Sequence, residues 1–135
     1  MPRQRRLRKV VAPPNFKGYK PYGARTRSID DEVELLYEEY EAIKLADYDL
    51  MNHAEAATLM GVSRATFARI YESARRKIAN AFVEVKEIKV VYGNAELDKD
   101  WFLCNHCMAR FTIPVKMPKD LCPLCGSQKV ESINK

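Results

Sequence analysis

The sequence predicts a mainly α protein, in which three helices follow a basic N-terminal arm and precede a small β domain. Two observations carry this prediction. Apolar residues recur at helical spacing in several stretches between residues 36 and 85, and four cysteines form two CxxC pairs near the C-terminus. At 135 residues the chain has about the length of one ordinary domain, so each of two modules must be small.

Charge is segregated along the chain. The net charge is +5 and the pI is about 9.0, which suggests a polyanionic partner. Residues 1–29 hold nine Lys or Arg and no acid, whereas residues 30–41 hold seven Asp or Glu and no base. A merely solvated surface explains the acidic stretch well and the basic stretch poorly.

The N-terminus and the hydropathy predict a cytoplasmic protein without a membrane segment. No apolar run approaches the roughly 20 residues of a membrane span, and Met1 is followed directly by arginines rather than by the apolar segment of a signal peptide. In a reducing compartment, paired cysteines more often bind metal than form disulfides, with hyperthermophiles as an exception.

Residues 1–28 are expected to form a basic arm, because prolines and glycines interrupt the basic residues. Residues 7–12 have the apolar pattern of a short strand. A similar pattern returns at residues 87–92, and we expect these two segments to pair.

Three helices are expected between residues 29 and 92. In the first, Leu36, Tyr40, Ile43 and Ala46 form an apolar stripe that ends near Asp47, and the residues between them form a polar face: Glu38, Glu39, Glu41 and Lys44. Asn52, with Glu55 three residues later, predicts the start of a second helix that reaches Met60. Gly61 ends it, and Ser63 caps a third helix that reaches about Glu84.

Residues 93–100 are polar and turn-forming, and are expected to be a linker to a domain of residues 101–135. There Cys104, Cys107, Cys122 and Cys125 form two CxxC pairs separated by 14 residues, a spacing typical of zinc knuckles. Four thiolates complete the tetrahedral shell of one structural zinc ion, Zn2+. Two disulfides, a redox CxxC pair and an iron–sulfur cluster are the alternatives.

The surrounding residues resemble a zinc ribbon. Residues 101–103 and 110–113 predict a hairpin, residues 129–133 a third strand, and Gly126 follows the last ligand in the sequence CPLCGS. His106 lies inside the first knuckle and is expected to be a loop residue, since four cysteines already satisfy the ion.

Residues 53–72 fit a helix-turn-helix, with small Ala57 at the helix crossing, Gly61 at the turn, and Val62, Phe67 and Ile70 directed inward. A helical hairpin packed for stability explains these apolar residues equally well, but not the cations on the other side. In a helix-turn-helix the start of the third helix enters the major groove, so Arg64, Ala65, Ala68 and Arg69 are expected to face base edges, with Thr66 near the backbone.

Other residues are better suited to phosphates. Ser63 lies at the helix start and Arg75, Arg76 and Lys77 farther along it, where the groove curves away. The basic residues of the arm are expected to follow the backbone or reach a minor groove, and a solubilising tail is the alternative; these residues are Arg3, Arg5, Arg6, Arg8 and Lys9.

The stretch SRATFARIYESARRKI (63–78) resembles the recognition helix of sigma-factor region four. Together with the MPR start, EAIKLAD and AATLMGVSRATFARIYESARRKIA, it is similar to an uncharacterised prokaryotic family of small predicted DNA-binding proteins with this type of helix-turn-helix. The resemblance covers residues 1–92 and implies DNA binding without naming a target. The chain departs from the family in having Gln4 in place of proline, and Tyr37 in place of a capping Ser, Thr or Asp.

These observations predict a sequence-specific, double-stranded DNA-binding transcriptional regulator. The ribbon is expected to be a second contact surface for DNA, RNA polymerase or another protein, and a homodimer is expected because one recognition helix covers a short site. No catalytic cluster suggests an enzyme. The alternatives are a protein-interaction adaptor of the transcription machinery and an RNA-binding protein, the latter suggested by Phe16, Tyr19 and Tyr22 in the basic arm.

Overall fold

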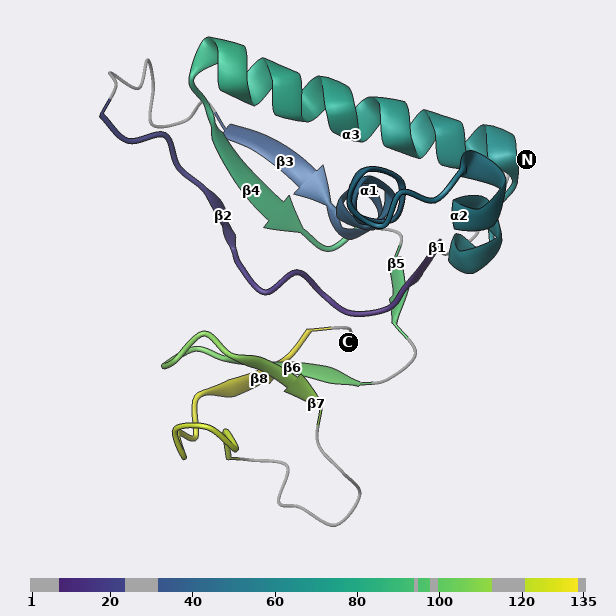
Figure 1. Cartoon of the computed structure of the whole chain (residues 1–135). Helices are drawn as coiled ribbons and strands as arrows, with labels where there is room; N and C mark the ends of the chain where they lie inside the picture. Colours follow the sequence, from purple (N-terminus) through teal and green to yellow (C-terminus); the bar gives the residue numbers. More distant parts are fainter. Residues whose placement is uncertain (1–7, 24–31, 94, 98–99, 113–120, 134–135) are drawn as a thin grey trace, which may run out of the picture.

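Consecutive helices lie between an earlier and a later group of strands in a computed structural model of the chain that describes residues 8–23, 32–93, 95–97, 100–112 and 121–133 (Figure 1). The helices of this described part are α1 (Tyr37–Ile43), its π-helical extension η1 (Lys44–Tyr48), α2 (His53–Met60) and α3 (Arg64–Glu84). The strands are β1 (Arg8–Val10), β2 (Gly18–Tyr19), β3 (Glu32–Leu36), β4 (Glu87–Val91), β5 (Ala95–Leu97), β6 (Trp101–Cys104), β7 (Arg110–Thr112) and β8 (Val130–Ser132).

The prediction of a mainly α fold with a helical N-terminal domain is wrong. Strands form three small sheets in the described residues, and one of them places β3 and β4 within residues 29–92, the part expected to be a three-helix domain. The physical reason is non-local pairing: β2 and β3 become strands because each lies along β4, a contact that local periodicity does not show. The chain therefore combines helices and sheets, with the cysteine cluster at its C-terminal end.

β4 is the central strand of the first sheet. It pairs in parallel with β3 and antiparallel with β2. Gly18 of β2 lies so close to β4 that a Cβ atom there would overlap the carbonyl oxygen of Ile88. The expected pairing of residues 7–12 with residues 87–92 is wrong, because β1 instead pairs in parallel with β5. β5 lies within the segment expected to be a linker, and its Ala95 and Leu97 are buried.

The first helix differs most from its prediction. It begins at Tyr37, and the Glu39 carboxylate accepts a hydrogen bond from the Leu36 backbone nitrogen at 2.9 Å, in place of a Ser, Thr or Asp cap. Glu38, Glu39 and Glu41, expected on a solvated face, are only 3, 3 and 2% exposed. They are buried because α3, β1 and β3 surround this short helix on several sides, as the end-on view of α1 in Figure 1 illustrates.

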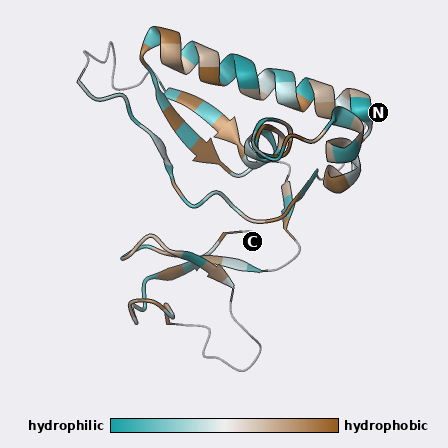
Figure 2. Ribbon diagram, viewed as in Figure 1, coloured by the Kyte–Doolittle hydropathy of each residue, from teal (hydrophilic) through white to brown (hydrophobic). Residues whose placement is uncertain are grey.

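α2 and α3 begin and end where the sequence predicts. α3 lies across the sheet of β2, β4 and β3, and in Figure 2 the hydrophobic residues of β3 and β4 lie beneath it. Leu35, Ala74, Ala81 and Ile88 are buried in that interface. Within the described residues, no helix is long and apolar enough to cross a membrane.

A further apolar cluster connects segments that are distant in sequence. Val10 of β1, Tyr37 of α1, and Ala95 and Leu97 of β5 are its buried members. Trp101 and Ile133, from the two ends of the described ribbon, pack against it. The ribbon is therefore attached to the helical part by hydrophobic contact as well as by the chain.

Candidate nucleic-acid interface and metal centre

Short-range hydrogen bonds fix the turn between α2 and α3. The Asn52 side chain accepts a hydrogen bond from the Glu55 nitrogen at 2.9 Å and starts α2. Gly61 ends it with a φ of 67°, a left-handed conformation that glycine adopts without steric cost. The Ser63 hydroxyl then accepts from the Thr66 nitrogen at 3.1 Å and starts α3. The capping residues expected from the sequence are confirmed.

The inner face of this helix pair is anchored by aromatic packing. Phe67 is completely buried, and its ring lies 5.2 Å from that of His53 and 6.0 Å from that of Tyr71, centroid to centroid. The Tyr71 hydroxyl donates a 2.6 Å hydrogen bond to Asp47 of η1, which raises the pKa of Tyr71. These contacts set the rotation of α3 about its axis, and hence the residues that face outward.

The outward face of the first turns of α3 carries most of the residues expected to read bases. Arg64, Ala65 and Arg69 are exposed, while Thr66 and Ala68 are half-buried. Residues four apart share one face of a helix, so Arg64 lies beside Ala68, and Ala65 beside Arg69. Ser63, at the helix start, is exposed as well.

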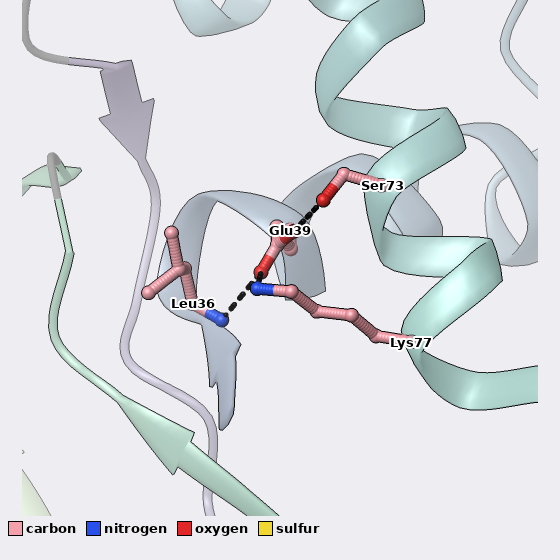
Figure 3. A network of polar contacts seen from close by, with 4 residues as sticks. All are labelled: Leu36, Glu39, Ser73 and Lys77. Atoms are coloured by element: carbon pink, nitrogen blue, oxygen red, sulfur yellow. Dashed lines mark hydrogen bonds and ion pairs between the residues drawn. The ribbon is translucent and has the colours of Figure 1, made fainter. Parts of the chain in front are cut away.

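Lys77 does not belong to this surface. Its ammonium group donates to Oε1 of Glu39 at 2.7 Å, while the Ser73 hydroxyl donates to Oε2 at 2.6 Å (Figure 3). The Glu39 side chain is only 4% exposed, so the pair lies between α1 and α3. Lys77 therefore balances a buried carboxylate, a role that the sequence pattern does not reveal because Glu39 is 38 residues away.

Arg75 and Arg76 remain on the outer face. The Arg75 guanidinium lies 5.3 Å from the centre of the Tyr71 ring. Arg76 forms a 2.9 Å ion pair with Glu72, but both side chains are more than 60% exposed. Exposed pairs of this kind contribute little stability, so a phosphate can replace Glu72 at small cost.

β1 places one of the expected arm cations, Lys9, beside the helix-turn-helix. A Cβ atom on Gly61 would lie 3.6 Å from Cδ and Cε of Lys9, so the Lys9 side chain runs beside the turn that precedes α3. Lys9 is exposed. Its position follows from the pairing of β1 with β5, which local sequence pattern cannot show. Arg3, Arg5 and Arg6 lie outside the described residues.

The structure brings the four cysteines together. The sulfurs of Cys104 and Cys125 are 3.6 Å apart, those of Cys107 and Cys122 are also 3.6 Å apart, and all four lie within 4.8 Å of one another. All four thiols are free. In a tetrahedral site with zinc–sulfur bonds of about 2.3 Å, the sulfurs are about 3.8 Å apart. The cluster therefore has the size and the ligand type to bind a metal ion such as zinc.

The two cysteine pairs lie on knuckles with the same backbone. In the first, the nitrogen of Cys104 donates to the oxygen of Ala109, and the nitrogen of Met108 donates to the oxygen of Cys104. In the second, the nitrogen of Cys122 donates to the oxygen of Ser127, and the nitrogen of Gly126 donates to the oxygen of Cys122. Met108 and Gly126 occupy the same left-handed position, with φ values of 66° and 74°. The predicted role of Gly126 is confirmed, and Met108 is its less favourable counterpart.

The knuckle backbone also favours the charged form of the buried thiols. The Cys107 nitrogen, 3.5 Å from the Cys104 sulfur, lowers the pKa of Cys104 to about 6 against the effect of burial. Burial raises the pKa of Cys122, but the N–H groups of Cys125 and Leu124 outweigh it, so the pKa lies below its usual value. N–H groups directed at sulfur stabilise thiolate, the form that binds metal.

Comparison with known proteins identifies the family. Residues 1–98 match the family described as "Protein of unknown function DUF134". The chain belongs to this family. Over 133 residues it is 40% identical to a UPF0251 protein of Chloroherpeton thalassium, a match that covers 98% of this chain and 87% of the relative. The sequence resemblance to an uncharacterised prokaryotic family is thereby confirmed.

Relatives in other lineages match over nearly the full chain as well. A UPF0251 protein of Clostridium tetani is 38% identical over 130 residues, covering 96% of this chain and 88% of the relative. One from Methanothermobacter thermautotrophicus is 36% identical over 136 residues, covering 99% of this chain and 69% of the relative. No solved structure matches the chain. The family match ends before Trp101, whereas these longer matches extend through the cysteine ribbon.

Proposed function

We propose that this chain is a sequence-specific DNA-binding protein and a transcriptional regulator, which reads duplex DNA with a helix-turn-helix unit formed by α2, the turn at Gly61 and α3. The observation that carries the proposal is the outward face at the start of α3. Arg64, Ala65 and Arg69 are exposed there, although Phe67 and Ile70 between and beside them are buried. Stability explains the buried residues but not the two exposed arginines, Arg64 and Arg69.

The exposed residues divide into readers and positioners. An arginine fork binds the O6 and N7 atoms of guanine, so Arg64 and Arg69 are the base readers, and Ala65 and Ala68 offer contact to a thymine methyl. The exposed helix start at Ser63 suits a phosphate, because its free N–H groups point along the helix axis. Arg75 and Arg76 bind phosphates farther along the groove, and Lys9 takes the place of Lys77 as the third such cation.

The ribbon has a structural part in this proposal. One zinc ion held by Cys104, Cys107, Cys122 and Cys125 leaves no open coordination position for a substrate. The ribbon packs against β1 through the cluster of Val10, Leu97 and Trp101. Since β1 also carries Lys9 beside the turn, the metal supports the cation that flanks α3.

The alternative of RNA binding loses support from the aromatic residues of the arm. Phe16 is half-buried and packs edge-on against Tyr19 and Tyr40, at centroid distances of 4.8 and 5.8 Å, so it belongs to the folded part of the chain and does not project from the surface as a stacking platform for a nucleic-acid strand. Tyr22 is 96% exposed. Tyr19 is 65% exposed, but its ring lies against that of Phe16. Two exposed rings, one of them already in a ring contact, are a weak platform for single-stranded nucleic acid, which is usually held by several stacked bases.

Selection of bound sequences from random duplex DNA, followed by fluorescence anisotropy with the selected duplex, tests the proposal. Arg69→Ala and Arg64→Ala should each weaken binding about tenfold or more and relax the preference at one base pair. Lys89→Ala, which removes the same charge from an exposed position on β4, is the matched control and should have a small effect.

A salt titration of the same complex separates DNA binding from protein docking. Binding through several phosphates should weaken steeply as salt is raised, with a slope that falls by about one when Lys9 is replaced by Ala. If no duplex is enriched, or if Arg69→Ala and Lys89→Ala bind the selected duplex equally, the proposed interface is wrong. A competing single-stranded RNA that binds more tightly than duplex DNA would favour the RNA alternative.

A further inference from the structure

A groove separate from the proposed DNA surface lies between the sheet, α1 and the C-terminal half of α3. Its volume is about 600 Å³. Leu35, Ala81 and Ile88 belong to the buried cluster that forms its floor, and Tyr40, Ile43 and Ile78 pack against that cluster and line the groove. Sites for small organic molecules typically enclose about 300–1,000 Å³ between largely apolar walls.

Aromatic rings form the walls of this groove. Phe16 and Tyr19 from the segment around β2 and Tyr40 from α1 meet edge to face, at 4.8 and 5.8 Å between centroids. Phe82 of α3 also lines the groove and is 75% exposed. An edge-to-face arrangement leaves ring faces open to a further apolar or aromatic group.

The charge at the groove has one sign. Among its described lining residues, Lys20 and Lys86 carry charge and none is acidic. Lys20 is 78% exposed and its contact with Glu87 is 4.0 Å long, at the outer limit of an ion pair. Lys86 pairs with Glu84 at 3.1 Å, and its side chain is 18% exposed against 51% for Glu84. The long, exposed contact of Lys20 is weak enough for an anionic group to replace it, while Lys86 adds a second positive charge at the same groove.

We infer that this groove is a binding site for a small organic acid with an aromatic or similarly apolar body. The body lies among the rings of Phe16, Tyr19, Tyr40 and Phe82, and the acidic group reaches Lys20 and Lys86. The inference does not depend on DNA binding, because none of the lining residues belongs to the proposed DNA surface.

Two probes with the same aromatic body test the inference on the full chain. The first, 8-anilinonaphthalene-1-sulfonate, carries an anionic group, and the second, N-phenyl-1-naphthylamine, does not. Titration followed by fluorescence should give one site per chain for each probe. Replacing both Lys20 and Lys86 by Gln should lower the affinity for the sulfonate probe about tenfold and leave the affinity for the uncharged probe nearly unchanged.

Matched variants locate the site. Tyr19→Ala and Phe82→Ala should each lower the affinity for both probes about fivefold or more, because each substitution removes an aromatic ring from the wall of the groove. Tyr22→Ala and Val83→Ala remove exposed apolar groups of the neighbouring sequence that do not line the groove, and should leave both affinities unchanged. Circular dichroism and a thermal melt on each variant exclude loss of fold as the cause.

Three results would overturn the inference. The first is several weak sites per chain, which indicates nonspecific surface binding. The second is equal weakening by the groove variants and by Val83→Ala. The third is a dimer, detected by sedimentation, that Phe82→Ala dissociates but that the probes do not dissociate. The occupant of the groove would then be a second copy of the chain.

Discussion

The helical part (residues 32–93) and the ribbon (residues 100–133) differ in the side chains that they bury. In the helical part, aliphatic and aromatic side chains from several helices and strands form continuous clusters around Met60, Phe67 and Ile88. In the described part of the ribbon, the buried cluster consists of Phe111 and two cysteines. A cluster so small does not order a three-stranded sheet by the hydrophobic effect alone, so we expect folding of the ribbon to depend on a metal ion bound by the four cysteines. The helical part instead places three acidic residues inside its own interior.

Removing a metal ligand should have the largest effect. Cys104→Ser should abolish metal binding by the chain and unfold the ribbon, because a three-ligand site holds zinc far more weakly. Metal content after dialysis and NMR amide dispersion measure these losses. His106→Ala changes an exposed residue of the same knuckle and should retain the metal.

The same variant shows whether the two parts are independent. Trp101, the only tryptophan of the chain, packs with Ile133 against Val10 and Leu97. Loss of the ribbon should therefore expose Trp101, shift its fluorescence to longer wavelength, and lower the stability of the helical part. If the helical unfolding transition of Cys104→Ser matches that of the parent chain, the junction contributes nothing and the two parts are separate units.

The next largest effect should come from the buried ion pair of the helical part. Lys77→Ala leaves the Glu39 carboxylate without its cation, and should lower the free energy of unfolding by about 2–3 kcal/mol, somewhat less than for a fully buried pair because Lys77 is 33% exposed. Arg76→Ala, one residue earlier, breaks the exposed pair with Glu72 and should cost about 0–1 kcal/mol.

Urea denaturation followed by helical circular dichroism measures both changes. Equal losses for Lys77→Ala and Arg76→Ala would show that Glu39 is hydrated and that the polar contacts of Figure 3 do not stabilise the helical part. Retention of DNA affinity by Lys77→Ala at low temperature would agree with its absence from the proposed interface.

α1 and α3 also show what local sequence can and cannot predict. The bounds of α3 follow from Ser63 and from an apolar stripe that meets one continuous interface, so they are predictable. α1 is short and surrounded, and its glutamates are buried because residues far along the chain supply their partners. The cysteine site was predictable because its ligands are local pairs. The place of Lys9 beside the turn and the presence of the groove were not predictable, because β1 and β2 are positioned by β5 and β4.

Glu41 gives the helical part a pH dependence of its own. Burial raises the pKa of Glu41, against the nearby Lys44 ammonium and a backbone hydrogen bond from Val11. A carboxyl group with a raised pKa in the folded state contributes stability that is present below the unfolded pKa of about 4.3 and is lost as pH rises through the folded pKa. Stability relative to a neutral variant should therefore fall from acid to neutral pH.

Glu41→Gln tests this by removing the titration. In urea denaturation at about pH 4 and about pH 7, the parent chain should lose more stability across the interval than Glu41→Gln does. The opposite order would mean that the charged form of Glu41 is the one stabilised in the folded protein, through Lys44. Glu96→Gln, an exposed acid on β5, should leave the pH dependence almost unchanged.

The smallest effect should come from the one difference between the two knuckles. Met108 holds a φ of 66° where the second knuckle has Gly126, and a residue with a side chain is strained there by about 1 kcal/mol. Met108→Gly relieves this strain but makes the unfolded chain more flexible, so the net gain in stability of the ribbon should be about 0.5 kcal/mol.

Gly126→Ala introduces the same strain into the second knuckle and should lower the stability of the ribbon by a similar amount. Competition with a chelator measures both as changes in metal affinity, because folding of the ribbon and metal binding are coupled. If both substitutions lower the metal affinity equally, packing of the Met108 side chain stabilises the first knuckle and the two knuckles are not equivalent.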